Sequence, residues 1–141
     1  MIKERYCSYE VARLLKEKGF DEECHHIYVG VTLEWTNTIY GDDVISNNEI
    51  PYVDTDVITA PTHQMACDWL QETHNLFLNV GFGNDVKGEF LYMVDIYDLS
   101  DSAVHGKYKP IVEADDYLKT NPKTVGDAIE AALKYSLENL V

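Results

Sequence analysis

Basic residues are scarce in this sequence: 11 Lys and Arg stand against 25 Asp and Glu, a formal net charge of −14 over 141 residues. A nucleic-acid-binding protein gains affinity by neutralising phosphates with Lys and Arg, so this balance argues against direct nucleic-acid binding. The same charge disfavours anionic membrane surfaces. Two interpretations stay open. The charge only keeps the protein soluble, or it serves binding to a basic partner, including mimicry of nucleic acid.

Cysteines and long apolar runs are also scarce. The three cysteines, Cys7, Cys24 and Cys67, are odd in number and form no Cys-x-x-Cys motif, so the sequence favours no disulfide framework. No stretch approaches the roughly 20 apolar residues of a membrane helix, and residues 1–20 lack the apolar core of a secretory signal. We therefore expect a cytoplasmic protein in a reducing compartment, with no membrane partner.

Internal repeats, low-complexity segments and linkers are absent, so the sequence predicts one globular domain over residues 1–141. A first helix is expected between Ser8 as its N-cap and Gly19 as its stop. A single strand is expected over residues 27–35, with a buried face formed by Ile27, Val29, Val31, Leu33 and Trp35. Residues 36–59 predict one or two short strands, with turns near Gly41 and Asn47-Asn48.

The second half of the chain predicts a helix, a hairpin and a helix. Two alternating runs flank GFGNDVKGEF and predict a β-hairpin over Leu76–Asp98, with one more edge strand near Ile111-Val112. Thr124 with Asp127 predicts the capped start of the last helix. Strands joined by short loops pair antiparallel, and helices need an apolar sheet face to cover. The sequence therefore predicts an α+β fold, a two-layer domain with a mainly antiparallel sheet and about three helices.

The stretch APTHQMACDWLQETHNLFLNV, residues 60–80, has the richest set of chemical side chains. His63 and Cys67 are four residues apart and share one side of a helix, but His74 lies roughly 16 Å further along it. Zinc takes four close ligands, and a cysteine nucleophile needs a base and an orienting group, whereas Asp68 points away around the helix. His63 and Cys67 therefore stay a weak candidate polar cluster.

We predict no catalytic, cofactor-binding or metal site and no cofactor. Met65, Trp69 and Leu70 fall on one helix face and are expected to be structural, packing in the core. The carboxylates of DIYDLSD (Asp95, Asp98 and Asp101) lack the spacing of a calcium loop and are interpreted as a solvated face that ends in a turn.

Three stretches together, RYCSYEVARLLKEKGFDE, APTHQMACDWLQETHNLFLNV and AIEAALKYSLENL, resemble small proteins of phages and mobile elements in Bacteroides-type gut bacteria. The resemblance spans most of the chain, and its most specific part is Ala-Pro-Thr-His-Gln-Met-Ala followed by Asp68-Trp69-Leu70. These relatives have no established activity, so the resemblance implies a genetic context and no functional residues. The chain departs from them at Cys67, where they often have methionine, and at Gln71, where they tend to have a basic residue.

Two functions remain open at this point. The first is a non-enzymatic accessory protein that binds a basic host protein through an acidic surface. The second is a protein that binds and sequesters a small molecule or nucleotide, in a pocket that includes Tyr28, Thr32 and Tyr97. A symmetric homodimer through the hairpin Leu76–Asp98 is a further expectation, because an edge strand offers unpaired amides.

Truncating Trp69 tests the structural interpretation of residues 60–80. Trp69→Ala is expected to open a cavity and to lower the free energy of unfolding by about 3–5 kcal/mol. His63→Ala and Cys67→Ala are expected to cost far less, and a chelator to leave the melting temperature unchanged. Denaturant unfolding of the three variants checks this. About one zinc per chain by elemental analysis, lost with His63→Ala, would contradict it.

Overall fold

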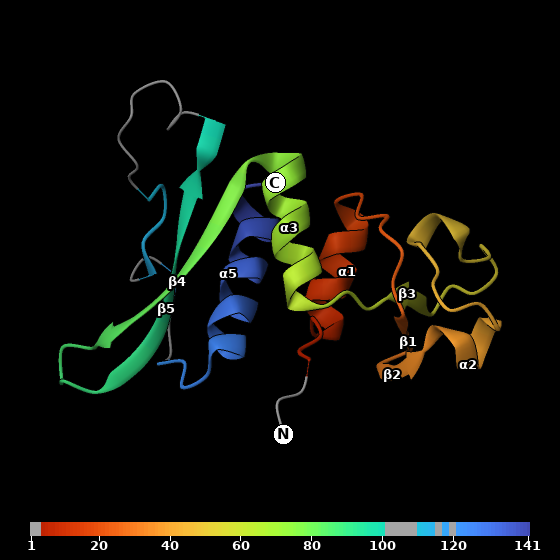
Figure 1. Cartoon of the computed structure of the whole chain (residues 1–141), viewed down its shortest axis with the longest axis horizontal. Coiled ribbons are helices and arrows are strands. Elements are labelled where there is room, and N and C mark those ends of the chain that lie inside the picture. The colour runs from red at the N-terminus through yellow and green to blue at the C-terminus, as the bar shows by residue number, and fades with distance from the viewer. Residues whose placement is uncertain (1–3, 101–109, 115–116, 119–120) are drawn as a thin grey trace. The chain divides into compact units, whose positions relative to one another are not determined.

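The computed structural model of the chain describes residues 4–100, 110–114, 117–118 and 121–141 (Figure 1). Its elements are α1 (Tyr9–Glu17), β1 (His26–Val29), β2 (Thr32–Trp35), α2 (Thr36–Tyr40), the 3-10 turn η1 (Asn47–Glu49), β3 (Val57–Thr59), α3 (His63–His74), β4 (Leu76–Asn84), β5 (Phe90–Asp98) and α5 (Val125–Asn139). One antiparallel sheet has the order β2-β1-β3, and β4 and β5 form a second. The predicted α+β class is confirmed, with α1, α3 and α5 as the predicted helices.

The chain forms two compact units, Met1–Ala66 and Cys67–Val141, and the boundary between them falls within α3. The first unit contains α1 and the three-stranded sheet. The second unit contains the β4–β5 hairpin and α5. The expectation of a single domain over residues 1–141 stays a prediction.

Both ends of α1 are fixed by the residues predicted to fix them. The Ser8 hydroxyl accepts a hydrogen bond from the N–H of Val11 at 3.2 Å. At the other end Gly19 adopts a left-handed φ of +96°. This conformation lets the N–H of Phe20 bond back to the carbonyl of Leu15 at 2.9 Å, which closes the last turn in a Schellman arrangement.

The predicted single strand over residues 27–35 is wrong, because the chain reverses in the middle of it. Gly30 adopts φ +61° and forms a two-residue turn, so Val29 pairs with Thr32 and His26 pairs with Trp35. The reversal moves Leu33 and Trp35 to the sheet face opposite Ile27. Ile27 is fully buried, whereas the predicted core residues Val31, Leu33 and Trp35 are 77%, 40% and 59% exposed.

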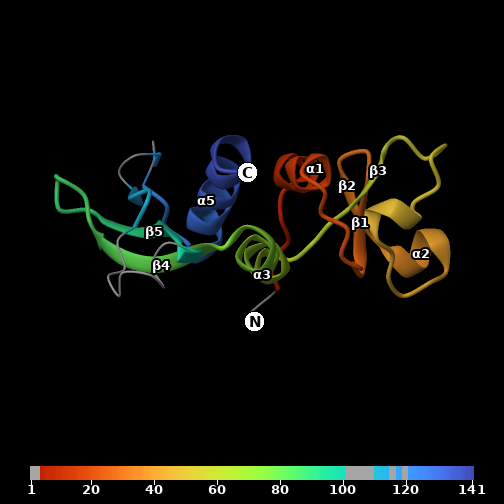
Figure 2. The same cartoon turned by 90° about the horizontal axis from the view of Figure 1, so that it is seen from above.

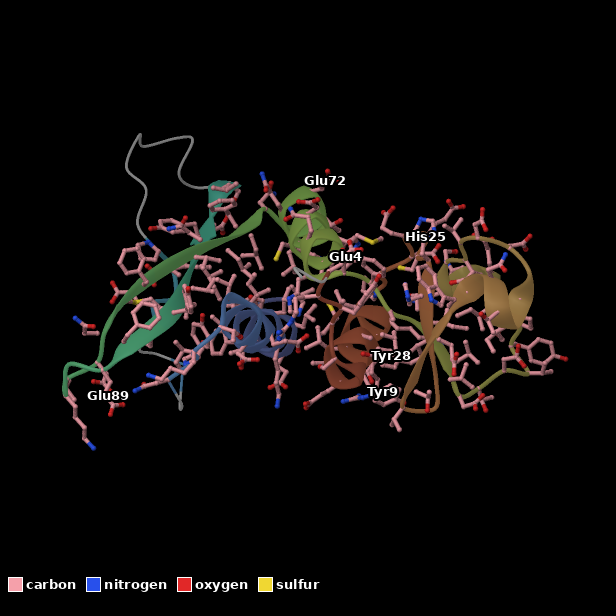
Figure 3. All side chains as sticks on the ribbon, turned by 60° about the horizontal axis from the view of Figure 1, so that its bottom comes forward. Glu4, Tyr9, His25, Tyr28, Glu72 and Glu89 are labelled. Carbon is pink, nitrogen blue, oxygen red and sulfur yellow. The ribbon has the colours of Figure 1, made fainter. Side chains whose placement is uncertain are left out.

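One face of the three-stranded sheet packs against α1. The buried cluster there consists of Ala12, Tyr28, Ile58 and Ala60, with Tyr9 packed against it. The rings of Tyr9 and Tyr28 meet edge to face, with centroids 5.7 Å apart, and lie side by side in Figure 3. The α1 stripe and this sheet face therefore form one layer interface, as the two-layer prediction requires.

The other face of this sheet is covered by residues 45–50. Ile27 and Val57 pack there against Ile45 and Ile50. The strand predicted within residues 36–59 is β3, but the segment also forms α2, which the sequence pattern did not predict. This short helix ends at Gly41, whose φ is +81°.

Asn47 joins three separate segments of the first unit. Its Nδ2 donates to the carbonyl of Phe20 at 2.8 Å, and its Oδ1 accepts from the N–H of Thr59 at 3.0 Å. Asn47 is only 9% exposed, so both bonds are shielded from water. The neighbouring Asn48 is exposed and binds the carboxylate of Asp21 at the surface.

Thr62 caps α3, since its hydroxyl accepts from the N–H of Met65 at 3.2 Å. Trp69 is 7% exposed and Leu70 is fully buried, while Met65 is half-buried. The helix gives way to β4 at Asn75, which adopts a left-handed φ of +56°. Asparagine is one of the few non-glycine residues that tolerate this conformation.

The predicted hairpin forms, and α5 lies over one of its faces (Figure 2). Val94 of β5 packs there against Ala128 and Ala132. The start of α5 is capped as predicted, with the Thr124 hydroxyl accepting from the N–H of Asp127 at 3.1 Å. None of the helices in the described ranges is long and apolar enough to cross a membrane.

The neighbouring pair Asn47 and Asn48 gives a matched test of the first unit's core. Asn47→Ala removes two buried hydrogen bonds, to the carbonyl of Phe20 and from the N–H of Thr59, which is expected to lower the free energy of unfolding by about 2–4 kcal/mol. Asn48→Ala removes an exposed bond and is expected to cost less than about 1 kcal/mol. Urea denaturation of both variants measures the difference. Equal losses would contradict the role of Asn47.

Candidate interaction surface

The fold brings Cys7 beside His63, a member of the weak candidate cluster of His63 and Cys67. His63 is the first residue of α3 and is buried, and Cys67, one turn later, is half-buried. The Sγ of Cys7 lies within 4.8 Å of a ring nitrogen of His63. Cys7 reaches this position because residues 5–7 and 61–63 run side by side, with the Cys7 N–H donating to the carbonyl of Pro61 at 2.9 Å. No local sequence signal joins the two segments, so the pair was missed.

Burial determines the state of two thiols. It raises the pKa of Cys24 to about 12, and it raises the pKa of Cys67 to about 11, with the neighbouring Asp68 adding to the effect. Only a thiolate acts as a nucleophile or metal ligand. Both groups are therefore neutral near pH 7 and poorly suited to either role.

The carboxylates near the end of β5 bind backbone amides. Asp95 accepts from the N–H of Ala114 at 3.1 Å, and Asp98 accepts from the N–H of Ser100 at 2.9 Å. Asp101 lies outside the described residues. The two described carboxylates therefore hold local backbone in place.

The three pocket residues of the small-molecule alternative do not share a sheet face. Tyr28 is 8% exposed and donates its hydroxyl to the carbonyl of Cys7 at 2.6 Å. Thr32 pairs with Val29, which puts it on the opposite face of the same sheet. Tyr97 belongs to the other sheet, on β5. The polar sheet face on which that pocket depended is not formed.

Charge is segregated within the first unit. Its basic residues all lie in the first 18 positions, on α1 and the segment before it, and residues 19–66 contain no Lys or Arg. The same residues 19–66 carry nine carboxylates: Asp21, Glu22, Glu23, Glu34, Asp42, Asp43, Glu49, Asp54 and Asp56. All nine are exposed or half-buried. The sheet and its loops therefore contribute negative charge and no Lys or Arg of their own.

Apolar side chains stand exposed among these carboxylates. Around β2 and α2, drawn in orange in Figure 1, Val31 is 77% exposed, Leu33 40%, Trp35 59% and Ile39 46%. We define the β2–α2 surface as these four residues together with Glu34, Asp42 and Asp43. Exposed apolar residues accompanied by polar neighbours are common in protein-binding sites.

Trp35 is held in place by an aromatic stack. The ring of His26 contacts those of Trp35 and Tyr6, with centroid distances of 4.0 Å and 4.3 Å and interplanar angles of 39° and 50°. Within the described part of the chain, the buried Nδ1 of His26 has no hydrogen-bond partner. Burial lowers the pKa of His26 below its ordinary 6.5. A neutral imidazole therefore supports one side of an exposed tryptophan.

No protein family, curated protein or solved structure was found that matches this chain.

His26 makes the stability of the stack depend on pH. Its folded-state pKa is lowered, so between pH 7 and about 5 the unfolded chain takes up a proton that the folded state resists, and stability falls with acidification. His26→Gln removes this contribution and is expected to lose less stability over that range than the wild type. His25→Gln, at the exposed neighbouring position, is the control for a histidine substitution that keeps the His26 ring. Urea titrations at each pH provide the measurement, and parallel curves for wild type and His26→Gln would contradict the assignment.

Proposed function

We propose that the protein is a non-enzymatic binding module that captures a basic surface of another protein with its β2–α2 surface. The observation that carries this proposal is the segregation of charge: residues 19–66 contain nine carboxylates and no Lys or Arg, and the same segment contains the exposed Trp35. In a phage or mobile element, the partner would be a basic host protein whose natural ligand is itself a polyanion. The free thiols of Cys7 and Cys24 fit action in a reducing cytoplasm.

The carboxylates and the exposed tryptophan contribute to binding in different ways. Carboxylates around an apolar patch accelerate encounter with a basic partner, and their effect weakens with salt. An exposed tryptophan at the centre of a patch supplies a large apolar area at low entropic cost, which is why tryptophan dominates many binding sites. The stack on His26 fixes the Trp35 ring before binding, so less conformational freedom is lost on association.

Capture of a partner from host lysate, followed by binding measurements on the purified pair, tests this function. Trp35→Ala is expected to weaken binding by about tenfold or more, while thermal unfolding changes little because the side chain is 59% exposed. Asp42→Asn with Asp43→Asn is expected to slow association at low salt and to remove most of the salt dependence.

Glu89→Gln is the matched charge control, because Glu89 is exposed at the turn of the hairpin in the second unit (Figure 3). It should leave binding unchanged. Binding that ignores ionic strength, or that falls equally with Glu89→Gln and with the Asp42/Asp43 double variant, would overturn the proposal.

A further inference from the structure

The two edges of the β4–β5 hairpin differ in their hydrogen bonding. The register is fixed by pairs such as Val80 with Val94. Beyond both ends of the ladder, hydrogen bonds join odd-numbered partners: Leu99 N–H to the Asn75 carbonyl, and Asp85 N–H to the Glu89 carbonyl. Because antiparallel ladders alternate, the even-numbered residues of each strand direct their N–H and carbonyl groups away from the partner strand.

The outer edge of β5 makes hydrogen bonds at four of these even positions. The N–H of Ile96 donates to the carbonyl of Val112 at 2.9 Å, which is the edge pairing predicted near Ile111-Val112. The N–H of Tyr92 donates to the carbonyl of Pro122 at 2.9 Å. The carbonyls of Phe90 and Val94 accept from the side chains of Lys123 and Tyr117.

Among the described residues, the outer edge of β4 makes no such bonds. Within the described part of the chain, no hydrogen bond is made to the outward groups of Leu78, Val80, Phe82 and Asn84. The strand LFLNVGFGN contains no charged residue and no proline, the usual devices that protect an edge. Phe77 and Val80 are each 39% exposed and Phe82 is 75% exposed.

We propose that β4 pairs antiparallel with β4 of a second copy of this chain, on a two-fold axis at Val80, to form a four-stranded sheet. This interface is separate from the β2–α2 surface. Two copies of this chain each carry a net charge of −14, so they repel one another over most of their surfaces. The strand β4 has nine residues and no charge, so this repulsion is smallest where two β4 strands meet. An isologous contact also closes after two copies, so it produces a dimer and no fibre.

The two-fold axis is placed at Val80 because two β4 strands then pair along their whole length. Val80 is the midpoint of Leu76–Asn84, so pairing about it uses every outward amide. Phe82 then faces Leu78 of the second copy, which places an exposed aromatic ring against an apolar neighbour. Asp85, directly after the strand, faces the neutral Asn75, so no carboxylate opposes another.

Amide exchange on the unmodified protein tests the pairing without any substitution. Light scattering over about a hundredfold range of concentration is expected to show a monomer converting to a dimer. Over the same range the amides of Val80 and Phe82 should become protected, while those of Asn79 and Gly81 stay protected throughout by β5. A monomer at every concentration, or odd and even amides that respond alike, would overturn the proposal.

Cysteine cross-linking tests the register. Across the proposed axis two Val80 Cα atoms lie about 5.5 Å apart, within disulfide range, whereas two Phe82 Cα atoms lie roughly 14 Å apart. Val80→Cys is therefore expected to form a covalent dimer on the order of tenfold faster than Phe82→Cys. Phe82 is 75% exposed and Val80 is 39% exposed. Cross-linking by random collision would therefore be faster for Phe82→Cys than for Val80→Cys. Equal rates, or a faster Phe82→Cys, would overturn the register; wild type under the same oxidant controls for the native cysteines.

Discussion

The surface of the first unit depends on one backbone constraint, the left-handed turn at Gly30. A two-residue turn reverses the chain and shifts the alternation of side chains by one position. Leu33 and Trp35 therefore share a face with Tyr28 and His26 instead of continuing the buried face of Ile27. The α1 helix covers the Tyr28 part of that face, and Trp35 at the edge stays exposed on the ring of His26. Residues that look like core in the sequence are thus exposed at the surface.

Negative charge and apolar exposure have different arrangements in the two units. In the first unit, residues 19–66 combine carboxylates with exposed apolar side chains and contain no Lys or Arg, which fits a partner of opposite charge. In the second unit, β4 exposes apolar side chains and backbone amides with no charge on the strand. A strongly acidic chain associates with itself most readily where charge is absent, since repulsion between like charges is smallest there. The two surfaces therefore suit two kinds of occupant, a basic protein and a second copy.

The buried polar groups mark where the fold depends on long-range contacts. Asn47 satisfies the backbone of Phe20 and Thr59 at once, and its burial means that neither group is compensated by water if the amide is lost. Cys7 and His63 come together only because residues 5–7 and 61–63 run side by side. Neither arrangement has a local sequence signature, because each joins segments that are distant along the chain.

Local chemistry determined much of this structure from the sequence alone. Ser8 and Gly19 bound α1, Thr124 caps α5, and the alternating runs around residues 85–89 form the hairpin, because caps, turns and periodicity act over a few residues. The excess of Asp and Glu over Lys and Arg is likewise evident from the sequence alone. The tertiary structure alone decided that Asn47 joins Phe20 to Thr59, that His63 lies beside Cys7, and that, among the described residues, the outer edge of β5 is hydrogen-bonded while that of β4 is not. These outcomes depend on which distant segments meet, and a single left-handed glycine inside an alternating run was enough to reverse the predicted face.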